Sequence, residues 1–496
     1  MSSALRVLFL AAEADPFFKV GGLGDVAGSL PPVLRRMGVD IRLALPLHGG
    51  IRMQGYPLQK VCNLEVSSLQ GAISVEVYGY EQATLPVYFI AGELIASESP
   101  VYTTDTHLDG LKYTFFSLAA LELCRHLSWQ PDILHANDWH TAPAVYSLSV
   151  DRKDRPFFSS TASVLGVHNL PYLGLGAETA LGYFGLPPAD SKSLPVWARQ
   201  LPLPLGLLMA DCIVAVSPSY AQEILTPEYG AGMQDLLRKR RSSLTGILNG
   251  LDVHTWDPQT DPHLEQNYSF QHLMRRALNK TALQSELGFE EAARTPLFAM
   301  VSRMDYQKGV DLLPEALRRL SERPENTRGD WQMVILGAGD LALEAAVRGL
   351  ERDFPGQVRA ITRFDAPLSH RIYAGSDILL IPSRYEPCGM TQMIAMRYGC
   401  VPVARATGGL RDTVRDIQQG ADSTGFLFEA PTPAALAAAM LRAMRVYQNE
   451  AIWQALQLRS MRRDFSWERS AQEYLRLYQE LSDARQKRSK KRPVEV

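Results

Sequence analysis

The first 37 residues contain the unit on which the fold prediction rests. The apolar run Leu5-Arg-Val-Leu-Phe-Leu10 has the composition of a buried strand, and the loop Lys19-Val-Gly-Gly-Leu-Gly-Asp25 follows it. A helix-like stretch then covers Val26–Met37. A strand, a glycine-rich loop and a helix in this order are typical of the first part of a βαβ unit. We therefore expect a parallel sheet whose first strand ends at a glycine-rich loop.

The same alternation of apolar runs and helical stretches continues to the end of the chain, which predicts an α/β fold with parallel, doubly wound sheets. The expected strands are Arg6–Ala12, Asp40–Pro46, Val75–Tyr80, Val87–Ala91, Asp132–Ala136, Ser163–His168, Cys212–Val216, Leu244–Leu248, Leu297–Val301, Gln332–Leu336, Val358–Thr362, Ile378–Ile381, Val401–Ala404 and Gly425–Phe428. The segment Val75–Ala91 also fits a hairpin around Glu81-Gln-Ala-Thr84, which would add an antiparallel edge. The turn Asn249-Gly-Leu-Asp252 separates two such series, so we expect two domains facing each other across a cleft.

Composition and charge exclude several classes of protein. The chain has 496 residues, of which 46% are hydrophobic and 21% charged, as in globular proteins. Its 51 basic and 53 acidic residues give a net charge of −2, which offers no general attraction for nucleic acid. Five scattered cysteines form no CxxC pair, and no apolar run has the roughly 18–20 residues of a membrane span. We expect a soluble, cytoplasmic protein with no nucleic acid and no membrane as partner.

The basic run Arg485–Arg492 is the one exception to this even charge, with six basic residues in eight. Such a run could contact nucleic acid or an anionic surface, but a solvated, frayed terminus is the favoured interpretation.

The loop Lys19–Asp25 has the features of an anion or sugar site. Its glycines let the backbone approach a ligand, and the following helix would present free N–H groups and a positive dipole end. Its spacing matches neither GxGxxG nor GxxxxGK[ST]. The residues alone leave two interpretations open, a phosphate or sugar loop and a glycine-rich turn without a ligand.

Two polar clusters follow strands of the first half. His135-Ala-Asn-Asp-Trp-His140 could bind metal, but without a third ligand in view we expect none. Contacts to a sugar and a structural hydrogen-bond network remain as alternatives for this segment. Gly166-Val-His-Asn-Leu170 places His168 and Asn169 at a strand end, where the histidine fits a polyol contact and a core position equally well.

The second half supplies cations and a carboxylate after its strands. Arg303 and Lys308 lie in one loop and could converge on a diphosphate, although a surface salt bridge is the alternative for either. Glu386 follows another strand, just before Gly389-Met-Thr391 opens a helix. We interpret Cys388 as a packing residue because it has no paired base, and Leu336-Gly-Ala-Gly-Asp340 as a structural turn.

These segments together resemble the glycogen and starch synthases, retaining transferases that extend an α-1,4-glucan from a nucleotide-activated glucose. The resemblance extends from about residue 5 to residue 478. The matching segments are Lys19–Asp25 (K-x-G-G-L-x-D), Val301–Gly309 (S-R-x-x-x-Q-K-G), Arg384–Gln392 (R-x-E-P-C-G-x-T-Q), Thr407–Val414, Asn249–Asp252 and Asp464–Trp467. The family implies a GT-B fold of two Rossmann-like domains. Here these would be residues 1–248 (acceptor side and glycine-rich loop), residues 249–470 (nucleotide-sugar donor) and a segment 471–496 that crosses back as a helix and ends in the basic tail.

The resemblance also implies roles for individual residues. The first-domain donor contacts would be Lys19, Gly21, Gly22, Asp25, Asp138 and Asn169, with His168 beside the reacting carbon. In the second domain the implied residues are Arg303 and Lys308 on the diphosphate, Gly389, Met390 and Thr391 on its distal phosphate, Phe364 on the base and Glu386 on the donor sugar. The resemblance implies neither a metal nor a cofactor.

The chain departs from the family in one region. Where the family has an aromatic- and lysine-containing stretch like F-L-K-x-G, this chain has Leu201-Pro-Leu-Pro-Leu-Gly-Leu-Leu208, and the stretch after Tyr172 is shortened. By the resemblance, both segments line the acceptor side.

The expected reaction is transfer of glucose from ADP-glucose to the non-reducing 4-hydroxyl of an α-1,4-glucan with retention of configuration. UDP-glucose remains open as donor, since only the resemblance favours ADP-glucose. A GT-B transferase with a small acceptor and a catalytically weakened glucan-binding or initiation protein are the alternatives. A glucan phosphorylase is disfavoured because no motif for a pyridoxal-phosphate lysine is visible.

Overall fold

The chain folds into two compact units. The computed structural model describes residues 4–98, 100–151, 156–322 and 331–490. Unit 1 combines Met1–Gly250 with Trp467–Val496, and unit 2 is Leu251–Ser466. The sequence analysis placed the divisions after residues 248 and 470, whereas the two units divide after residues 250 and 466. Each unit is an α/β domain built on its own sheet.

Unit 1 contains a nine-stranded sheet in the order β3-β4-β5-β2-β1-β6-β7-β8-β9. Its strands are β1 (Arg6–Leu10), β2 (Asp40–Pro46), β3 (Gln59–Ser68), β4 (Gly71–Gln82), β5 (Leu85–Gly92), β6 (Ile133–Asn137), β7 (Ala162–Val167), β8 (Cys212–Ala215) and β9 (Leu244–Gly246). Pairing is parallel except along β3-β4-β5, which forms an antiparallel extension. The strand β1 pairs with β2 on one side and β6 on the other. The order of strands therefore reverses between β1 and β6, at the place where doubly wound sheets bind ligands.

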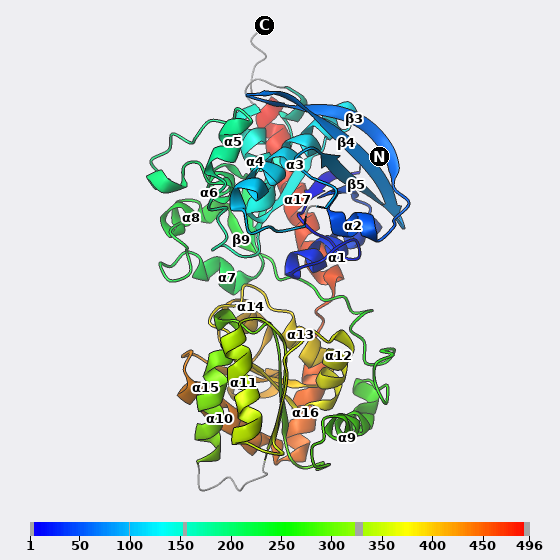
Figure 1. Cartoon of the computed structure of the whole chain (residues 1–496), viewed down its shortest axis with the longest axis vertical. Helices are drawn as coiled ribbons and strands as arrows, with labels where there is room; N and C mark the ends of the chain where they lie inside the picture. The colour runs from blue at the N-terminus through cyan, green and yellow to red at the C-terminus, as the bar shows by residue number, and fades with distance from the viewer. Residues whose placement is uncertain (1–3, 99, 152–155, 323–330, 491–496) are drawn as a thin grey trace. The chain divides into compact units, whose positions relative to one another are not determined.

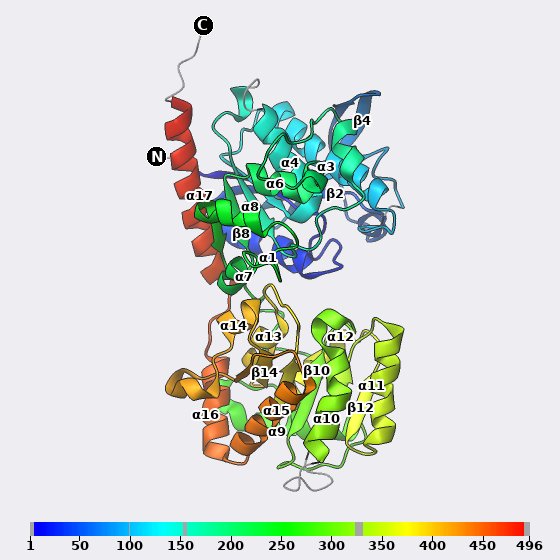
Figure 2. The same ribbon diagram turned by 90° about the vertical axis from the view of Figure 1, so that its left-hand side faces the viewer.

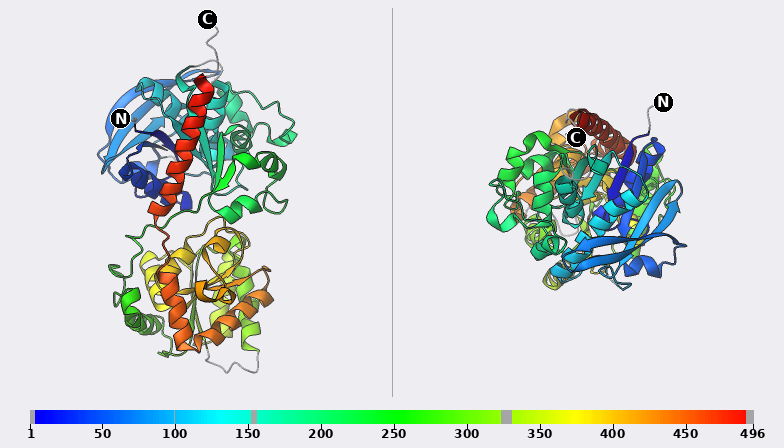
Figure 3. Two further views of the ribbon diagram at one scale, coloured as in Figure 1. Left: turned by 180° about the vertical axis from the view of Figure 1, so that it is seen from behind. Right: turned by 90° about the horizontal axis from the view of Figure 1, so that it is seen from above.

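Helices cover both faces of this sheet. The helices α3 (Thr106–His126), α4 (Asp138–Asp151) and α6 (Pro202–Met209) pack together on one face. On the other face α17 (Trp467–Lys490) lies against α1 (Gly22–Arg36), β6 and β7, and Figures 2 and 3 show it running along unit 1. The shorter helices are α2 (Gly49–Met53), α5 (Glu178–Tyr183), α7 (Pro218–Glu223), α8 (Gln234–Lys239) and the 3₁₀ turns η1 (Pro156–Phe158), η2 (Val196–Ala198) and η3 (Arg241–Ser243).

Unit 2 contains a parallel six-stranded sheet in the order β12-β11-β10-β13-β14-β15. Its strands are β10 (Leu297–Val301), β11 (Gln332–Leu336), β12 (Val358–Ile361), β13 (Ile378–Ile381), β14 (Val401–Arg405) and β15 (Phe426–Phe428). Here the reversal point lies between β10 and β13, which pair through Phe298 and Ala299. The loops after these two strands carry the predicted cations and Glu386.

The helices of unit 2 sandwich its sheet, with α10, α11 and α15 along one face and α9, α12 and α16 along the other (Figure 1). They are α9 (Arg276–Glu286), α10 (Leu313–Ser321), α11 (Leu341–Asp353), α12 (Ala366–Gly375), α13 (Thr391–Arg397), α14 (Gly408–Thr413), α15 (Pro433–Tyr447) and α16 (Glu450–Met461), with 3₁₀ turns η4 (Phe270–Arg275), η5 (Tyr306–Lys308), η6 (Val310–Leu312) and η7 (Ile417–Asp422). Buried side chains such as Phe298, Leu317 and Trp331 form a continuous apolar core, the main source of its stability.

The predicted strands are confirmed, each within a few residues of its expected bounds. The hairpin alternative for Val75–Ala91 is also confirmed, since β4 and β5 pair antiparallel around Ala83 and Thr84. The sequence prediction missed β3, whose side chains are mostly exposed at the edge of the sheet.

Two further expectations need correction. The first helix begins at Gly22 rather than Val26, so Asp25 belongs to its first turn. The basic segment is not frayed at its start, because residues 485–490 continue α17, while 491–496 lie outside the described residues. Within the described ranges, no helix combines the length and apolar character needed to cross a bilayer.

Candidate functional site

A buried carboxylate holds the glycine-rich loop of unit 1. Glu13, which is 2% exposed, follows β1 and accepts hydrogen bonds from the backbone N–H of Val20 and Gly21, the latter at 3.0 and 3.2 Å. The Tyr102 hydroxyl donates to the same carboxylate at 3.1 Å. Burial raises the pKa of Glu13, and these hydrogen bonds act in the opposite direction. The loop is thus held by a charged acceptor that the sequence analysis did not identify.

The predicted residues of this loop surround the start of α1. Lys19 forms an ion pair with Asp25, which lies in the first turn of the helix. Gly21 is the N-cap residue, and Gly22, at the first helical position, is exposed. A methyl group on Gly24 would lie 2.9 Å from Lys19 Cγ, so the side chain at position 24 must be small for the loop to close. The arrangement presents backbone N–H groups and an ammonium group at a helix start, which suits an anion or hydroxyl ligand.

Asp138, His168 and Asn169 come together at the ends of β6 and β7. The Asp138 carboxylate accepts the backbone N–H of His168 at 2.7 Å and that of Asn169 at 3.4 Å. Asp138 has a φ of 53°, an uncommon conformation for a residue other than glycine and one that clusters at functional sites. Burial raises the pKa of Asp138 and lowers the pKa of His168. A buried carboxyl group and a neutral imidazole therefore lie close together at the carboxyl ends of β6 and β7.

The two histidines of the His135–His140 segment have structural surroundings. His135 Nδ1 lies 2.5 Å from the Tyr478 hydroxyl of α17, and burial lowers its pKa to about 3. His140 packs against Tyr102, Tyr113 and Trp139, and burial lowers its pKa well below the usual range. Across the described ranges, no group of three or more His, Cys, Asp or Glu side chains is placed to hold a metal ion.

In unit 2 the structure brings Lys308 and Glu386 into direct contact. Lys308 Nζ lies 2.6 Å from Glu386 Oε2, and the Ser383 hydroxyl donates to the same oxygen at 3.0 Å. Glu386 is 7% exposed, so the pair is largely removed from water. The two residues are 78 positions apart in the chain and meet because β10 and β13 are neighbours in the sheet. An ammonium and a carboxylate in one place can bind a phosphate and a sugar hydroxyl side by side.

The loops on either side of this pair are fixed to one another. Arg384 donates two parallel hydrogen bonds to Asp311, at 2.7 and 2.8 Å, and its backbone N–H donates to the Gln307 carbonyl at 2.7 Å. Gly309 has a φ of 70°, and a side chain there would clash with the Pro382 carbonyl. The backbone around Lys308 and Glu386 is therefore preorganised.

Arg303 and Phe364 extend into solvent. The Arg303 side chain is 65% exposed and forms an ion pair with Asp305 at 3.2 Å, and Phe364 is 89% exposed. Among the described residues, neither side chain forms a hydrogen bond or ion pair with Lys308 or Glu386, so the structure leaves these two predicted residues apart from the pair. Their exposure leaves both free to meet a ligand.

Gly389, Met390 and Thr391 form the start of α13, as predicted. Gly389 has a φ of 72°, and Gln392 Nε2 donates to its carbonyl at 3.0 Å. A side chain on Gly389 would lie 3.0 Å from Glu386 Cγ, which places this helix start directly beside the carboxylate. Cys388 is buried at 6% exposure, and the glycines of Leu336–Asp340 allow close packing on the backbone of Ser302 and Met304, which gives that turn a structural purpose.

The altered segment Leu201–Leu208 forms most of α6. Residues 201–207 are buried, and the helix packs on α4. A side chain on Gly206 would lie 2.8 Å from the Ala142 methyl group, which shows how closely the two helices approach. The apolar residues of this segment therefore belong to the core of unit 1.

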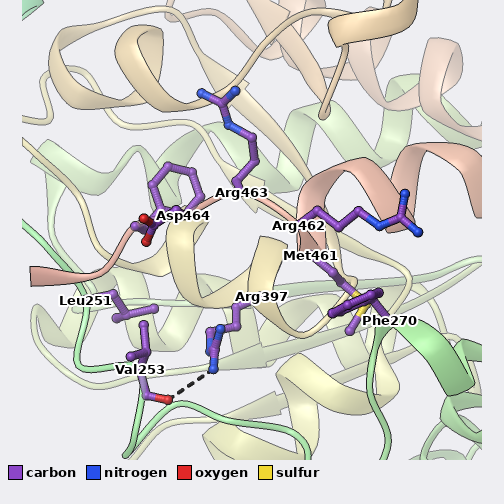
Figure 4. A pocket seen from close by; sticks show the side chains of 9 residues that line it. Leu251, Val253, Phe270, Arg397, Met461, Arg462, Arg463 and Asp464 are labelled. Atoms are coloured by element: carbon purple, nitrogen blue, oxygen red, sulfur yellow. Dashed lines mark hydrogen bonds between the residues drawn. The ribbon is translucent and has the colours of Figure 1, made fainter. Parts of the chain in front are cut away.

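Two hollows in unit 2 have no predicted site residue in their walls. One, of about 320 Å³, lies beside residues 251–253 and 461–465 (Figure 4). Figure 4 shows its Arg397 turned to the Val253 carbonyl, to which Nη2 donates at 3.1 Å. The other, of about 580 Å³, has charged walls in which Arg411 is paired with Glu429 and Arg442 with Asp416. Arg397, Arg411 and Arg442 each also donate a hydrogen bond to a backbone carbonyl.

Two family models match the chain. Residues 6–239 match the model described as the starch synthase catalytic domain, and residues 287–454 match that of the group 1 glycosyl transferases. A glycogen synthase from Thermotoga maritima is 40% identical over 96% of this chain and 98% of its own length. A glycogen synthase from Anaeromyxobacter dehalogenans is 41% identical over 97% of this chain and all of its own.

Solved structures agree with these similarities. The catalytic domain of starch synthase IV from Arabidopsis thaliana, bound to ADP and acarbose, is 33% identical with a TM-score of 0.85, and the match covers 97% of this chain and 100% of that one. A sucrose-phosphate synthase from Thermosynechococcus elongatus shares the fold, with a TM-score of 0.61 at 18% identity, over 97% of this chain and 100% of that one.

Proposed function

The chain belongs to the glycogen and starch synthase family of GT-B glycosyltransferases, and from this we propose that it transfers glucose from ADP-glucose to the non-reducing 4-hydroxyl of an α-1,4-glucan with retention of configuration. The observation that carries the proposal is the contact of Lys308 with Glu386 at 2.6 Å, beside the start of α13. The choice of ADP-glucose is supported by the starch synthase described above, which binds ADP.

In unit 2, Lys308 and Arg303 would bind the diphosphate, whose negative charge grows as the bond to glucose breaks. The N–H groups of Gly389, Met390 and Thr391 would bind its distal phosphate, with Phe364 on the base. Glu386 would accept hydrogen bonds from the donor glucose. Lys308, held against Glu386, is a cation in a fixed position, and a fixed cation stabilises the developing charge without rearrangement, often the largest contribution to catalysis.

In unit 1, Asp138, His168 and Asn169 would contact the glucose, and the loop Lys19–Asp25, with Gly21 and Gly22, would contact the donor. The 4-hydroxyl of the acceptor would attack from the face that the diphosphate leaves, and a phosphate oxygen would take its proton. This route retains configuration without a nucleophile from the protein.

The test is a transfer assay with radiolabelled ADP-glucose or UDP-glucose, with and without a glycogen primer, counting label in precipitated polymer. We expect incorporation that requires the primer and prefers ADP-glucose. Incorporation from UDP-glucose alone would contradict the donor assignment. Donor binding without incorporation would favour a small acceptor or a glucan-binding protein.

Arg303→Ala tests the cation in the same assay. We expect kcat to fall by on the order of 10²–10³, as on loss of one preorganised donor in other enzymes. Arg318→Ala is the matched control, because Arg318 is a comparably exposed arginine of unit 2 paired with Asp353 at 3.1 Å. A loss below threefold for Arg303→Ala would remove Arg303 from this role.

A further inference from the structure

Asn137 lies within hydrogen-bond distance of His168. The sequence analysis gave Asn137 no role of its own. Asn137 is the last residue of β6 and is 1% exposed. Its Nδ2 donates to the Leu10 carbonyl at 2.8 Å, and its Oδ1 lies 2.9 Å from His168 Nε2. A carbonyl oxygen can only accept, so the atom that faces Leu10 must be the NH₂ group. Oδ1 therefore faces the imidazole, and the ring nitrogen opposite it must carry the proton.

From this chain of hydrogen bonds we infer that Asn137 is a positioning residue that holds His168 in the neutral Nε2–H tautomer and leaves Nδ1 as the acceptor for a substrate hydroxyl. The inference rests on the proposed function for the identity of that hydroxyl, a glucose hydroxyl of the donor. Nδ1 makes no hydrogen bond within the described part of the chain, whereas the backbone N–H of His168 is held by Asp138 at 2.7 Å. Both the ring and the backbone of His168 are thus fixed.

Gly166 gives independent support for this arrangement. It pairs with Asn137 across β6 and β7, and a methyl group on it would lie 2.7 Å from Asn137 Oδ1, 3.2 Å from His135 Nε2 and 3.4 Å from His168 Nε2. A side chain there would enter the space in which the amide meets the ring. The absence of a side chain at position 166 is therefore a requirement of the contact between Asn137 and His168.

The charged groups around His168 allow the contact to be tested by pH. Asp138 favours the protonated imidazole, whereas burial opposes it. The other titratable rings near His168 are His135 and His140, and burial lowers the pKa of each. Asn137→Asp would add a carboxylate within hydrogen-bond distance of Nε2. That charge would hold a second proton on the ring, and Nδ1 could no longer accept. We expect the acidic limb of the pH profile of kcat/KM to move upward by ~1–3 pH units.

Asn279→Asp is the matched control. Asn279 is a buried asparagine of unit 2 whose Nδ2 donates to the Gln266 carbonyl at 2.7 Å and whose Oδ1 accepts the backbone N–H of Gln266 at 3.1 Å. It should lose stability without a shift of the acidic limb. Asn137→Ala should lower kcat on the order of 10–10², since the ring is no longer oriented. An acidic limb of Asn137→Asp that coincides with that of the parent would overturn the inference.

A second measurement needs no transfer activity. Nitrogen-15 NMR of histidine-labelled full-length protein at pH 7 reports the tautomer of each ring, and comparison with His168→Gln assigns the His168 signals. We expect a protonated Nε2 and an unprotonated Nδ1. An Nδ1–H tautomer or an imidazolium would overturn the inference even if the enzyme is active. If no donor is turned over, the proposed function fails while the tautomer still decides this inference.

Discussion

At the scale of single residues, the candidate site depends on acceptors that hold backbone. Glu13 is the clearest case, because its carboxylate accepts from Val20, Gly21 and the Tyr102 hydroxyl at once. A carboxylate only accepts, so it suits three donors, whereas an amide would turn its NH₂ group against one of them. The conformation of the loop Lys19–Asp25 is therefore tied to one buried charge.

We predict that Glu13→Gln loosens this loop. The expected result is a fall in kcat/KM for the nucleotide sugar on the order of 10², since displacement of binding groups by about 1 Å can have this effect. The free energy of unfolding should fall by about 1–3 kcal/mol, the usual effect of losing hydrogen bonds to a charged group. Steady-state kinetics and urea unfolding measure the two quantities.

The control for this variant is Glu351→Gln. Glu351 lies in α11 and accepts the Ala360 N–H at 2.8 Å, so it also holds backbone, but it is not among the predicted site residues. It should lose stability and keep kcat/KM. Equal kinetic losses in the two variants would show that Glu13 acts only through general stability.

The sequence predicted the chemistry of these residues better than their contacts. Lys308 and Glu386 were each identified from a loop after a strand, but their contact depends on β10 and β13 being neighbours, which sequence order does not reveal. Glu13 and Asn137 were missed because their hydrogen bonds reach the backbone of other segments, at Val20–Gly21 and Leu10. A polar residue just after or at the end of a strand was the only available signal.

At the scale of elements, α17 packs against β6, the strand that precedes Asp138. Tyr478 and Tyr474 of this helix pack on the His135 ring, with ring centroids 5.8 and 5.6 Å away. His135 is neutral there, since burial lowers its pKa to about 3. The contact between helix and sheet thus contains a histidine that stays neutral in the folded protein down to about pH 3.

We predict that this contact makes unit 1 sensitive to acid. An unfolded histidine titrates near 6.5, so between that pH and about 3 the unfolded chain binds a proton that the folded chain does not. The free energy of unfolding must therefore fall as pH falls, by up to about 1.4 kcal/mol per pH unit for one proton. Urea unfolding of the parent and His135→Gln at pH 7, 6 and 5 measures this slope.

His135→Gln should have a shallower slope than the parent. Part of the slope should remain, since burial also lowers the pKa of His48 in unit 1 to about 4. Gln271→Ala, which alters an exposed side chain of unit 2 that carries no titratable group, should leave the slope unchanged. Identical slopes for the parent and His135→Gln would contradict the assignment to this contact.

Elements were predicted well where burial shaped the sequence. The strands buried on both faces, such as β8 and β13, are continuous apolar runs in the sequence. The edge strand β3 was missed because most of its side chains are exposed, and the strand is held in the sheet by its pairing with β4. The start of α1 was placed late because glycines at its first positions weaken the helical signal, whereas the hydrogen bonds of Glu13 fix that start.

At the scale of the whole molecule, unit 2 is continuous in sequence and unit 1 is not. Unit 2 has a core of its own, so we predict that residues 251–466 expressed alone fold cooperatively. Residues 1–250 alone lack α17, which buries Ala471, Tyr474 and Tyr478 in unit 1. That fragment should unfold at clearly lower urea concentration than unit 1 in the full chain.

Tryptophan fluorescence and circular dichroism during urea unfolding measure both fragments. Addition of a peptide of residues 467–490 should restore stability to the 1–250 fragment. The same peptide with Tyr474 and Tyr478 replaced by serine is the control and should not. A 1–250 fragment as stable without the peptide as with it would show that α17 is dispensable.

The return of α17 to unit 1 also sets the order in which a newly made chain can be finished. A ribosome releases the nine strands of unit 1 first, then all of unit 2, and only at the end the helix that packs on β6 and β7. The surface of unit 1 on which α17 packs therefore stays uncovered while unit 2 is synthesised. A chain that ends anywhere before residue 467 lacks α17, so its unit 1 remains incomplete although it was synthesised first.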